Sequence, residues 1–462
     1  MRGDTIAAVA TAAGKGALAI LRMSGPAAAT IAAGLVTPWP LVARRATRVR
    51  LVDHETGALL DDAVATWYVA PHSFTGEDVL ELSVHGGGYV SALVLAALVA
   101  RGARPALPGE FTERAVREGK LDLLQAEAIG ELIAARSRAT HRAALRQLSG
   151  ALTRQLAELR EALLHIEALL AYEIDFPEED DGPQPRSRAT EAGVAVLAVL
   201  DRLLATLPQA LRARDGLQVV LAGAPNAGKS SLFNALLGDP RAIVSDVPGT
   251  TRDAIEAMLD AEPWPWRLID TAGLRTSTDQ VERLGVEVSE RRLAGADVVL
   301  VCADDDDRLA QALAQIAALA PARRIAVRTK VDDARAAASW TPSAALATAL
   351  QTVGAHGAIA VSATHGIGLD ALRAQMAAVA LVVEPEPTES QPMILRARHA
   401  AALRSAREEV GAFLDAWESQ ALPAPVVATH LRAAVHMLDE LMGTIDMDDI
   451  LGRVFRDFCV GK

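Results

Sequence analysis

The segment Gly223–Ser231, with the sequence GAPNAGKSS, constrains the fold of this chain more than any other. An apolar run over 217–222, typical of a β-strand, leads into it, and an apolar pattern with helical spacing follows it. The glycines let successive backbone N–H groups turn toward one anion. Lys229 supplies a cation for the β- and γ-phosphates, and the hydroxyl of Ser230 is a ligand for Mg²⁺. The strand before the loop and the helix after it favour a nucleoside triphosphate site over a simple glycine-rich turn.

The composition is that of a globular protein with several domains. The 462 residues are enough for two or three domains, and 51% of them are hydrophobic and 23% charged. The formal charge of −12 argues against a general nucleic-acid binder, although one basic face suffices for a specific one. Two cysteines, Cys302 and Cys459, are too few for a disulfide framework or a four-cysteine zinc site, which suits a reducing cytosol.

The N-terminus contains an Ala-rich run that resembles a signal peptide. Asp4, Lys15 and Arg22 interrupt this run with charges. We find no later apolar run of the roughly 18 residues that a membrane span needs. The sequence therefore predicts a cytoplasmic protein.

Four successive ranges of the chain differ in their patterns. Residues 1–118 mix short β-like runs with one apolar helix pattern, which predicts an α/β domain, and residues 119–215 have helical spacing. Residues 216–383 alternate strand-like and helical stretches, as a doubly wound, mostly parallel sheet requires. Residues 384–462 begin with the proline-rich linker Glu384–Pro392 and return to helix. The predicted fold class is therefore multidomain α/β plus α, with the nucleotide domain inserted between two helical parts that pack together.

Three motifs after the phosphate loop identify the nucleotide. In DTAG, the Asp270 carboxylate can hold Mg²⁺ through water, and the Gly273 N–H can contact the γ-phosphate. TKVD at 329–332 and VSAT at 361–364 each follow a strand, as the guanine-reading loops of GTPases do. A buried Asp332 carboxylate that accepts from N1 and N2 of guanine would reject adenine, which lacks those donors. The order of the motifs predicts GTP.

The TKVD motif has Thr329 where GTPases usually have Asn. Thr329 can donate a hydrogen bond, but it lacks the amide that braces the phosphate loop and contacts the base, so we expect GTP specificity with somewhat weaker affinity. The segment Ile243–Asp253 occupies the position of the first switch, in which Thr251 is the candidate to contact Mg²⁺ and the γ-phosphate. The residues expected at the nucleotide are Asn226, Ala227, Gly228, Lys229, Ser230, Ser231, Ser245, Asp246, Val247, Pro248, Gly249, Thr250, Thr251, Asp270, Thr271, Ala272, Gly273, Thr329, Lys330, Asp332, Ser362, Ala363 and Thr364.

A family resemblance follows from the motifs taken together. GAPNAGKSSLFNALLG, VPGTTRD, DTAGLR, VERLGVE and the terminal FCVGK resemble the bacterial tRNA-modifying GTPase family MnmE, also called TrmE. FTGEDVLELSVHGG, PGEFTERA and GKLDLLQAEAI extend the resemblance over essentially the whole chain. It implies an N-terminal domain that resembles tetrahydrofolate-binding domains and mediates dimerisation, a long-helix domain, and an inserted Ras-like P-loop GTPase domain.

At the nucleotide site the resemblance implies GTP hydrolysis that depends on K⁺ and on dimerisation. A monovalent cation neutralises charge that develops between the β- and γ-phosphates, as an arginine finger does in other GTPases. The matching K⁺ ligands are Asn226, Ser245, Val247 and Thr250. Glu282 matches the residue that orients the attacking water, whereas the residues alone favour a solvated side chain at the start of a switch helix.

The resemblance also implies a site for a tetrahydrofolate derivative, 5,10-methylene- or 5-formyl-tetrahydrofolate. The matching residues are Arg22, Glu81, Lys120 and Lys462. Glu81 can accept hydrogen bonds from the donor edge of a pterin ring, and the cations can pair with glutamate-tail carboxylates. Cys459 is implied to act in the alkylation chemistry; without the family it reads as a packed helix-terminal residue. Cys302 lies in an apolar strand pattern and is expected in the core.

The implied reaction adds an aminomethyl or carboxymethylaminomethyl group to C5 of the wobble uridine of certain tRNAs. A homodimer of the chain would act in a heterotetramer with the FAD-carrying protein MnmG, and the chain itself has no dinucleotide fingerprint. The Arg-rich segment Ala135–Arg146 can approach tRNA phosphates, although a solvated helix face is the default. Two alternatives stay open: a ribosome-assembly GTPase, and a nucleotide-gated binding switch whose alkylation chemistry lies in the partner.

Overall fold

The computed structural model describes residues 3–53, 56–135, 137–175, 186–238, 242–243, 255–262, 264–270, 293–319, 322–383, 392–420, 422–443 and 461. The chain divides into two compact units. Unit 1 consists of Met1–Gly130, Gln147–Val196 and Ser405–Lys462, and unit 2 consists of Glu131–Arg146 and Leu197–Arg404. These units cut across the four ranges expected from the sequence, whose boundaries stay a prediction.

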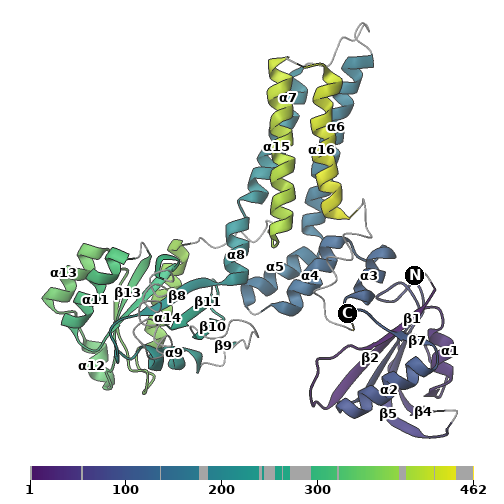
Figure 1. Ribbon diagram of the computed structural model, residues 1–462, viewed down its shortest axis with the longest axis horizontal. Helices are drawn as coiled ribbons and strands as arrows, with labels where there is room; N and C mark the ends of the chain where they lie inside the picture. The colour runs from purple at the N-terminus through teal and green to yellow at the C-terminus, as the bar shows by residue number, and fades with distance from the viewer. Residues whose placement is uncertain are drawn as a thin grey trace, which may run out of the picture. The chain divides into compact units, whose positions relative to one another are not determined.

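Unit 1 contains a seven-stranded sheet in the order β3-β4-β5-β6-β2-β1-β7. Only β1 and β7 are parallel neighbours. Helices α1 (Ala28–Ala33) and α2 (Gly88–Ala100) are packed on the sheet (Figure 1). The strands are β1 Thr5–Val9, β2 Leu18–Ser24, β3 Val36–Thr37, β4 Thr47–Val52, β5 Leu59–Tyr68, β6 Val79–His85 and β7 Ala103–Pro105.

Strand alternation separates the two faces of this sheet. Leu21 and Met23 of β2 are buried in the core beneath α1 and α2. Because successive side chains of a strand point to opposite faces, Arg22 lies on the other face. Its register partner on β6 is Glu81. The pairing of β2 with β6 therefore brings together two residues that lie far apart in the sequence.

The rest of unit 1 is helical. A stripe of leucines at spacings of three and four, including Leu156, Leu159 and Leu163, is buried along α6. α6 packs against α16, and the Arg160 Nε donates to Asp439 Oδ1 at 2.7 Å. Helical segments before and after the nucleotide-binding region therefore pack together, as expected. The helices that lie wholly or partly in this unit are α3 Glu110–Arg117, α4 Leu123–Ala134, α6 Ala151–Asp175, α7 Arg186–Leu204, α15 Ala397–Ser419 and α16 Ala424–Met442, whereas most of α5 (Arg138–Leu148) belongs to unit 2.

One segment corrects the expectation that the chain has no run apolar enough to cross a membrane. Within the described residues, an 18-residue window of Arg186–Asp215 meets that criterion by length and composition, with a mean hydropathy of 1.6. The structure divides it into α7 and α8 (Leu207–Asp215). Val196, Leu200 and Leu203 are buried at helical spacing, which is the pattern of a helix that packs one face against protein.

Unit 2 contains a second seven-stranded sheet, in the order β14-β13-β12-β8-β11-β10-β9. The strands from β14 to β11 are parallel, and β10 pairs antiparallel with both β11 and β9. The strands are β8 Leu217–Ala222, β9 Ala242–Ile243, β10 Ile255–Leu259, β11 Trp266–Asp270, β12 Val298–Ala303, β13 Arg323–Arg328 and β14 Ala358–Ala360. The helices are α9 Lys229–Leu237, α11 Asp306–Leu319, α12 Ala334–Ser339, α13 Ala344–Val353 and α14 Leu369–Val383.

Both faces of the unit 2 sheet are buried. Val219 and Leu221 of β8 belong to the core on one face, and Val220 belongs to the core on the other. A parallel sheet covered on both faces is the doubly wound architecture predicted from the sequence. Cys302 is fully buried in β12, as expected, and burial raises the pKa of its thiol to about 12.

Candidate functional site

The candidate nucleotide site of unit 2 lies at the carboxyl edge of the parallel strands. β8 ends at the phosphate loop, β11 ends at Asp270, β13 leads into TKVD, and β14 leads into the SAT sequence at 362–364. Since parallel strands end at the same edge, the fold brings these four segments together from distant parts of the chain. The sequence predicted each segment; the sheet order places them side by side.

The phosphate loop has a backbone that only certain residues can adopt. Gly223 has φ +142°, and a Cβ there would lie 2.1 Å from the Cys302 carbonyl oxygen of β12. Gly228, with φ +80°, and Asn226, with φ 61°, also have left-handed backbones. The glycines at the ends of the loop are therefore required by close approach and by backbone conformation. The exposed N-terminal turn of α9 begins directly after Gly228, which is the arrangement that binds phosphate.

Lys229 is held inside this loop. Its side chain is buried, and its Nζ donates hydrogen bonds to the carbonyl oxygens of Gly223 at 2.9 Å and Ala224 at 2.8 Å. The loop carbonyls thus fix the ammonium group at the start of α9. A cation held in this position is ready to meet an anion at the helix N-terminus.

Thr329 corrects one part of the sequence analysis. Its Oγ1 lies 2.8 Å from the Ala227 carbonyl oxygen of the phosphate loop and 3.1 Å from the Ala303 carbonyl oxygen of β12. The side chain is buried and lies next to Gly228. The expectation that threonine leaves the phosphate loop without a brace is wrong, because the hydroxyl donates to the loop as a side-chain amide would. The expected weaker affinity for GTP stays a prediction.

Asp332 and the SAT segment meet as expected of a guanine-reading site, but Asp332 is not buried. Ser362 Oγ donates to Asp332 Oδ1 at 2.6 Å, and Thr364 Oγ1 lies 3.4 Å from the same oxygen. The Asp332 side chain is 56% exposed, so the expected burial is wrong for the protein without a base. The hydrogen bond from Ser362 lowers the pKa of the Asp332 carboxyl, which keeps it ionised as an acceptor.

His365 was missed by the sequence analysis. Its Nδ1 lies 3.1 Å from both Ser362 Oγ and Thr364 Oγ1, and 3.5 Å from Asp332 Oδ1. No residue spacing pointed to it, apart from its position directly after SAT. Ala363 lies between the two hydroxyl residues of this segment and is partly buried.

For Mg²⁺, the described residues offer oxygen donors of the right kind. Ser230 is exposed at the start of α9, and Asp270 is buried at the end of β11, which pairs with β8. Within the described ranges, no group of three His, Cys, Asp or Glu side chains could hold a metal by itself. Mg²⁺ is commonly bound by one or two protein oxygens together with phosphate oxygens, so this donor set fits the ion with its nucleotide.

Several predicted site residues lie outside the described part of the chain. They are Ser245, Asp246, Val247, Pro248, Gly249, Thr250, Thr251, Thr271, Ala272, Gly273, Glu282, Cys459 and Lys462. Their assignments stay predictions. Of the remaining nucleotide residues, Ser231 is exposed on the first turn of α9, and Lys330 follows Thr329 with a left-handed φ of 61°.

Unit 1 pairs two of the four residues expected at the folate site, Arg22 and Glu81, and a third, Lys120, contacts the loop that precedes β6. Arg22 donates from Nε at 2.9 Å and from Nη2 at 2.7 Å to Glu81 Oε1. Lys120 donates from Nζ to the Pro71 carbonyl oxygen, in the loop that precedes β6. The guanidinium of Arg22 lies 5.5 Å from the centre of the Phe74 ring in the same loop.

Aromatic rings surround the pair of Arg22 and Glu81, and the sequence analysis missed them. Phe111 of α3 lies 5.7 Å from the Arg22 guanidinium. Burial and the nearby charge and hydrogen bond of Glu81 raise the pKa of Tyr68 on β5. The pair of Arg22 and Glu81 therefore lies beside aromatic rings from α3 and from the loop before β6.

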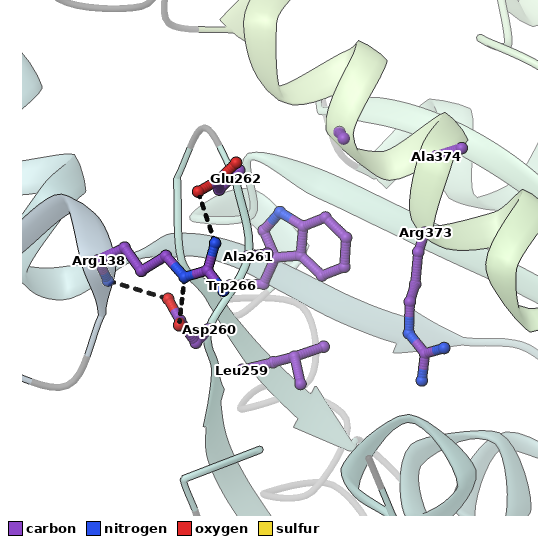
Figure 2. Close-up of a pocket in the computed structure, with 9 residues that line it drawn as sticks. Arg138, Leu259, Asp260, Ala261, Glu262, Trp266, Arg373 and Ala374 are labelled. Carbon is purple, nitrogen blue, oxygen red and sulfur yellow. Dashed lines mark hydrogen bonds and ion pairs between the residues drawn. The ribbon is translucent and has the colours of Figure 1, made fainter. Parts of the chain in front are cut away.

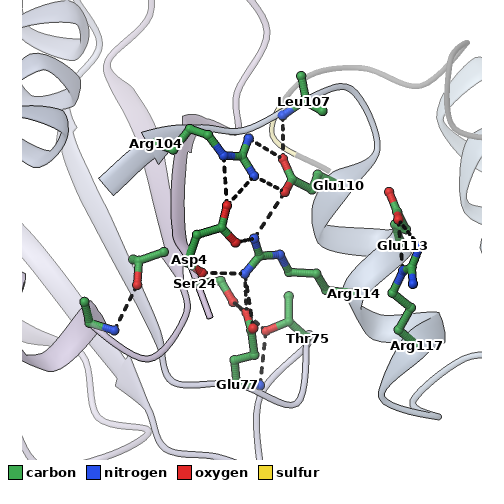
Figure 3. Close-up of polar contacts among 12 residues, drawn as sticks. Asp4, Ser24, Thr75, Glu77, Arg104, Leu107, Glu110, Glu113, Arg114 and Arg117 are labelled. Carbon is green, nitrogen blue, oxygen red and sulfur yellow. Dashed lines mark hydrogen bonds and ion pairs between the residues drawn. The ribbon is translucent and has the colours of Figure 1, made fainter. Parts of the chain in front are cut away.

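A network of partly buried ion pairs holds the loop that carries Phe74. Figure 3 shows Arg104 and Arg114 pointing at Asp4 and Glu110, with Glu77 on the far side of Arg114. Arg104 Nη2 lies 2.6 Å from Glu110 Oε1, and Arg114 Nη2 lies 2.7 Å from Asp4 Oδ1. Arg114 also reaches Glu77, at 3.1 Å. The network therefore links β1, β7, α3 and the loop before β6.

The carboxyls of this network have lowered pKa values. Burial raises the pKa of Asp4 and of Glu110, but hydrogen bonds from Arg104, with further contributions that include Arg114, outweigh burial and lower both below their ordinary values. Glu77 receives a further hydrogen bond from Ser24 Oγ at 2.6 Å. The charges stabilise one another only while the carboxyls are ionised.

A separate cavity of unit 2 lies at the opposite edge of the sheet from the phosphate loop. It has a volume of about 340 Å³ and is lined by residues of the β10–β11 hairpin, α14 and the start of α5. Figure 2 shows Arg138 pointing at Asp260 and Glu262 beside this cavity, and Arg138 Nη1 lies 3.0 Å from Glu262 Oε1. The Arg138 N–H also donates to Asp260 Oδ1 at 3.0 Å. Arg138, which belongs to the Arg-rich segment Ala135–Arg146, is therefore paired with carboxylates.

The fold and the site together define a P-loop GTPase. The family model described as the MnmE helical domain matches residues 123–459, and the model described as the GTP-binding protein TrmE N-terminus matches residues 5–120. The chain therefore belongs to the MnmE family of tRNA modification GTPases.

Curated relatives named tRNA modification GTPase MnmE match over their whole length. The relative from Moorella thermoacetica is 41% identical over 100% of this chain and 100% of its own. The relative from Azoarcus sp. is 42% identical over 99% and 98%, and the one from Chloroflexus aurantiacus is 41% identical over 99% and 100%. The family match decides against the ribosome-assembly alternative.

The hydrogen bond from Thr329 Oγ1 to the Ala227 carbonyl oxygen predicts the effect of Thr329→Val. Valine keeps the shape but leaves the buried carbonyl of Ala227 without its donor, which costs about 1–3 kcal/mol. Because the phosphate loop is then held less firmly, we expect the Kd for GTP to rise about tenfold. Titration with a fluorescent GTP analogue measures this change. Thr348→Val, which removes a hydroxyl bonded to Ala344 on exposed α13, is the control and should leave the Kd unchanged.

The ion-pair network predicts a local loss of stability in Arg114→Met. Removing this largely buried guanidinium leaves the carboxylates of Asp4 and Glu110 without one of their partners, which costs about 3 kcal/mol. Hydrogen exchange of peptides from β1 and β7 should rise accordingly. Arg117→Met removes an exposed pair with Glu113 on the same helix, and it should change exchange little. Equal exchange in the two variants would contradict the role of the network.

The same network predicts a dependence on pH. Since the folded pKa values of Asp4 and Glu110 are lowered, their contribution is present above the ordinary carboxyl values near about 4 and is lost as the pH falls through the lowered values. The protection of β1 and β7 from hydrogen exchange should therefore be constant from pH 7 to pH 5 and should decrease when the pH is lowered below 4. In Arg114→Met the fall should be smaller, because fewer ion pairs remain to be lost.

Proposed function

We propose that this chain, a tRNA modification GTPase by family, hydrolyses GTP in a K⁺-dependent reaction at the carboxyl edge of the unit 2 sheet. The observation that carries the proposal is the meeting of the phosphate loop, Thr329, Asp332 and Ser362 at one edge. Thr329 links the phosphate loop to the base-reading segment, so triphosphate and guanine are read by one connected set of residues. Mg²⁺ bound with the nucleotide would neutralise charge on the β- and γ-phosphates, with Ser230 and Thr251 among its ligands.

The described residues take distinct parts in this reaction. Lys229 binds the β- and γ-phosphate oxygens, and the N–H groups of 226–231 donate to the same groups. The carboxylate of Asp332 accepts from N1 and N2 of guanine, while Ser362 keeps that carboxylate oriented. Asp270 would help to hold Mg²⁺ through a water molecule. The guanine contacts reject adenine because its N1 is an acceptor.

The proposal assigns K⁺ to Asn226 together with Ser245, Val247 and Thr250. Asn226 is exposed at the tip of the phosphate loop with a left-handed backbone, so its amide oxygen is available to a cation beside the phosphates. We assign to Glu282 the role of orienting the attacking water through a second water molecule. The support for K⁺ and for Glu282 is the family resemblance.

We propose further that Arg22, Glu81, Lys120 and Lys462 bind a tetrahydrofolate derivative. Glu81 accepts from the pterin ring, and the cations bind the glutamate-tail carboxylates. Phe74, Phe111 and Tyr68 support this assignment, because rings around a charged pair suit a flat heterocycle. The folate would supply the one-carbon unit for C5 of the wobble uridine, with Cys459 acting in the alkylation.

The proposed assembly follows from the same resemblance. A cytoplasmic homodimer would act with the FAD-carrying MnmG on tRNA, and GTP hydrolysis would drive a conformational change. The proposed domains are residues 1–118 for folate and dimerisation, 119–215 and 384–462 for the helical domain, and 216–383 for the GTPase.

The K⁺ assignment is tested by turnover of the full-length chain in KCl and in NaCl. Turnover should be at least about tenfold higher in KCl, and Asn226→Ala should lower it about 100-fold in KCl, since removing one group that stabilises transition-state charge has this effect. The Kd of Asn226→Ala for GDP should differ less than about threefold from that of the original chain. Equal turnover in the two salts would reject the K⁺ assignment and leave the GTP site standing.

The folate assignment is tested by Glu81→Gln, with Glu113→Gln as the control. Glu81→Gln should keep GTP turnover but reduce wobble-uridine modification about 100-fold in a reconstituted reaction, measured by mass analysis of tRNA nucleosides. Glu113 lies on α3 in an exposed pair with Arg117, so its variant should modify tRNA normally. Full modification by Glu81→Gln would favour the alternative in which this chain is a nucleotide-gated switch and the alkylation lies in the partner.

A further inference from the structure

The segment that follows β13 is anchored to the end of β12 by several contacts. The Thr329 N–H donates to the Ala303 carbonyl oxygen at 2.8 Å. Arg328 Nε donates to the Asp304 carbonyl oxygen at 3.0 Å, and its Nη1 pairs with Asp306. The turn 303–306 therefore supports the backbone of the base-reading segment from the neighbouring strand.

Asp304 also fixes a side chain of that segment. The Lys330 Nζ lies 2.9 Å from Asp304 Oδ2, and Arg308 Nη1 lies 3.0 Å from Oδ1. Each carboxylate oxygen thus meets one cation. The hydrogen bond from Lys330 and that from Arg308 lower the pKa of the Asp304 carboxyl, so the pair stays charged.

The conformation of Lys330 has to be stabilised by contacts with other residues. Its backbone is left-handed, with φ 61°, which a residue with a Cβ adopts only when its surroundings hold it there. Its side chain is 49% exposed and has four rotatable bonds above the backbone, and within the described part of the chain its charged partner is Asp304. A lysine side chain loses roughly 2 kcal/mol of rotamer entropy when it is fixed.

The position of Lys330 makes this order relevant to the nucleotide. It lies between Thr329, which donates to the phosphate loop, and Asp332, which Ser362 orients toward a guanine base. A side chain ordered before the ligand arrives does not have to be ordered by the ligand, which favours binding.

We propose that Asp304 is a positioning residue for the guanine nucleotide: it holds Lys330 with its aliphatic stem directed along the base-binding side of the site. This inference rests on the proposed guanine site. Asp304 acts through Lys330 and does not touch the nucleotide. Its loss therefore shortens the lifetime of the bound nucleotide and leaves the hydrolytic step intact.

The experiment compares full-length Asp304→Asn with Asp307→Asn, using a fluorescent GDP analogue. Both variants remove one negative charge, and Asp307 is exposed three residues further along, on the first turn of α11. Asp304→Asn should release the analogue about fivefold faster, and its Kd for the analogue should rise about fivefold. Its turnover at saturating GTP should stay within twofold of the original. Asp307→Asn should release the analogue at the original rate. Asp304→Glu, which keeps the charge, should recover most of the difference.

A double-mutant cycle tests whether Asp304 acts by positioning Lys330 or by supporting the whole segment after β13. Lys330→Ala should weaken binding, and adding Asp304→Asn to it should have no further effect, because the group that Asp304 positions is gone. Additive losses in the cycle, or unchanged release by Asp304→Asn, would overturn the inference. If the unaltered chain fails to bind the GDP analogue, the proposed function itself fails; if it binds and Lys330→Ala does not weaken it, only the present inference fails.

Discussion

The nucleotide site depends on one hydrogen bond between strand ends, from Thr329 Oγ1 to the Ala227 carbonyl oxygen. This bond joins the phosphate loop to the segment that we propose reads the base. The two segments leave the sheet from strands separated by β12, and the Cys302 carbonyl oxygen of β12 approaches Gly223 so closely that no side chain fits there. The packing of three strand ends thus fixes how the phosphate loop and the segment after β13 lie relative to each other.

The sequence predicted the parts of this site that follow from pattern and spacing. Runs of apolar residues predicted β8, β11, β12 and β13. The motifs at the ends of these strands predicted which segments meet in the site, because parallel strands share a carboxyl edge. The edge strand β9 and the hairpin strand β10 were not predicted. β9 spans two residues, and a strand that short leaves no alternation to read.

Side-chain chemistry was harder to predict than topology, and Thr329 shows why. A hydroxyl and an amide differ in reach, so the residue type suggested a missing brace; the closeness of Ala227 and Ala303 lets the shorter side chain make the bond. The rings around Arg22 were missed for a related reason. Phe74 and Phe111 come from a loop and a helix that only the folded unit 1 brings to β2. The contacts of Arg138 with Asp260 and Glu262 were not predicted either, because these residues lie 122 and 124 positions away from it in the sequence.

In both units, the charged groups that would meet a ligand are already fixed by other charged or polar groups. Glu81 is held by Arg22, Asp332 by Ser362, and Lys330 by Asp304. The partly exposed ion pairs of Arg22 with Glu81 and of Lys330 with Asp304 contribute little to folding, since solvent screens them. Their value lies in binding, because a side chain fixed before the ligand arrives loses less entropy when it binds. The same arrangement limits affinity where the ligand has to compete with the existing partner. At Glu81 the pterin ring would share a carboxylate with Arg22, whereas at Lys330 the base would meet the aliphatic stem and leave the ion pair with Asp304 in place.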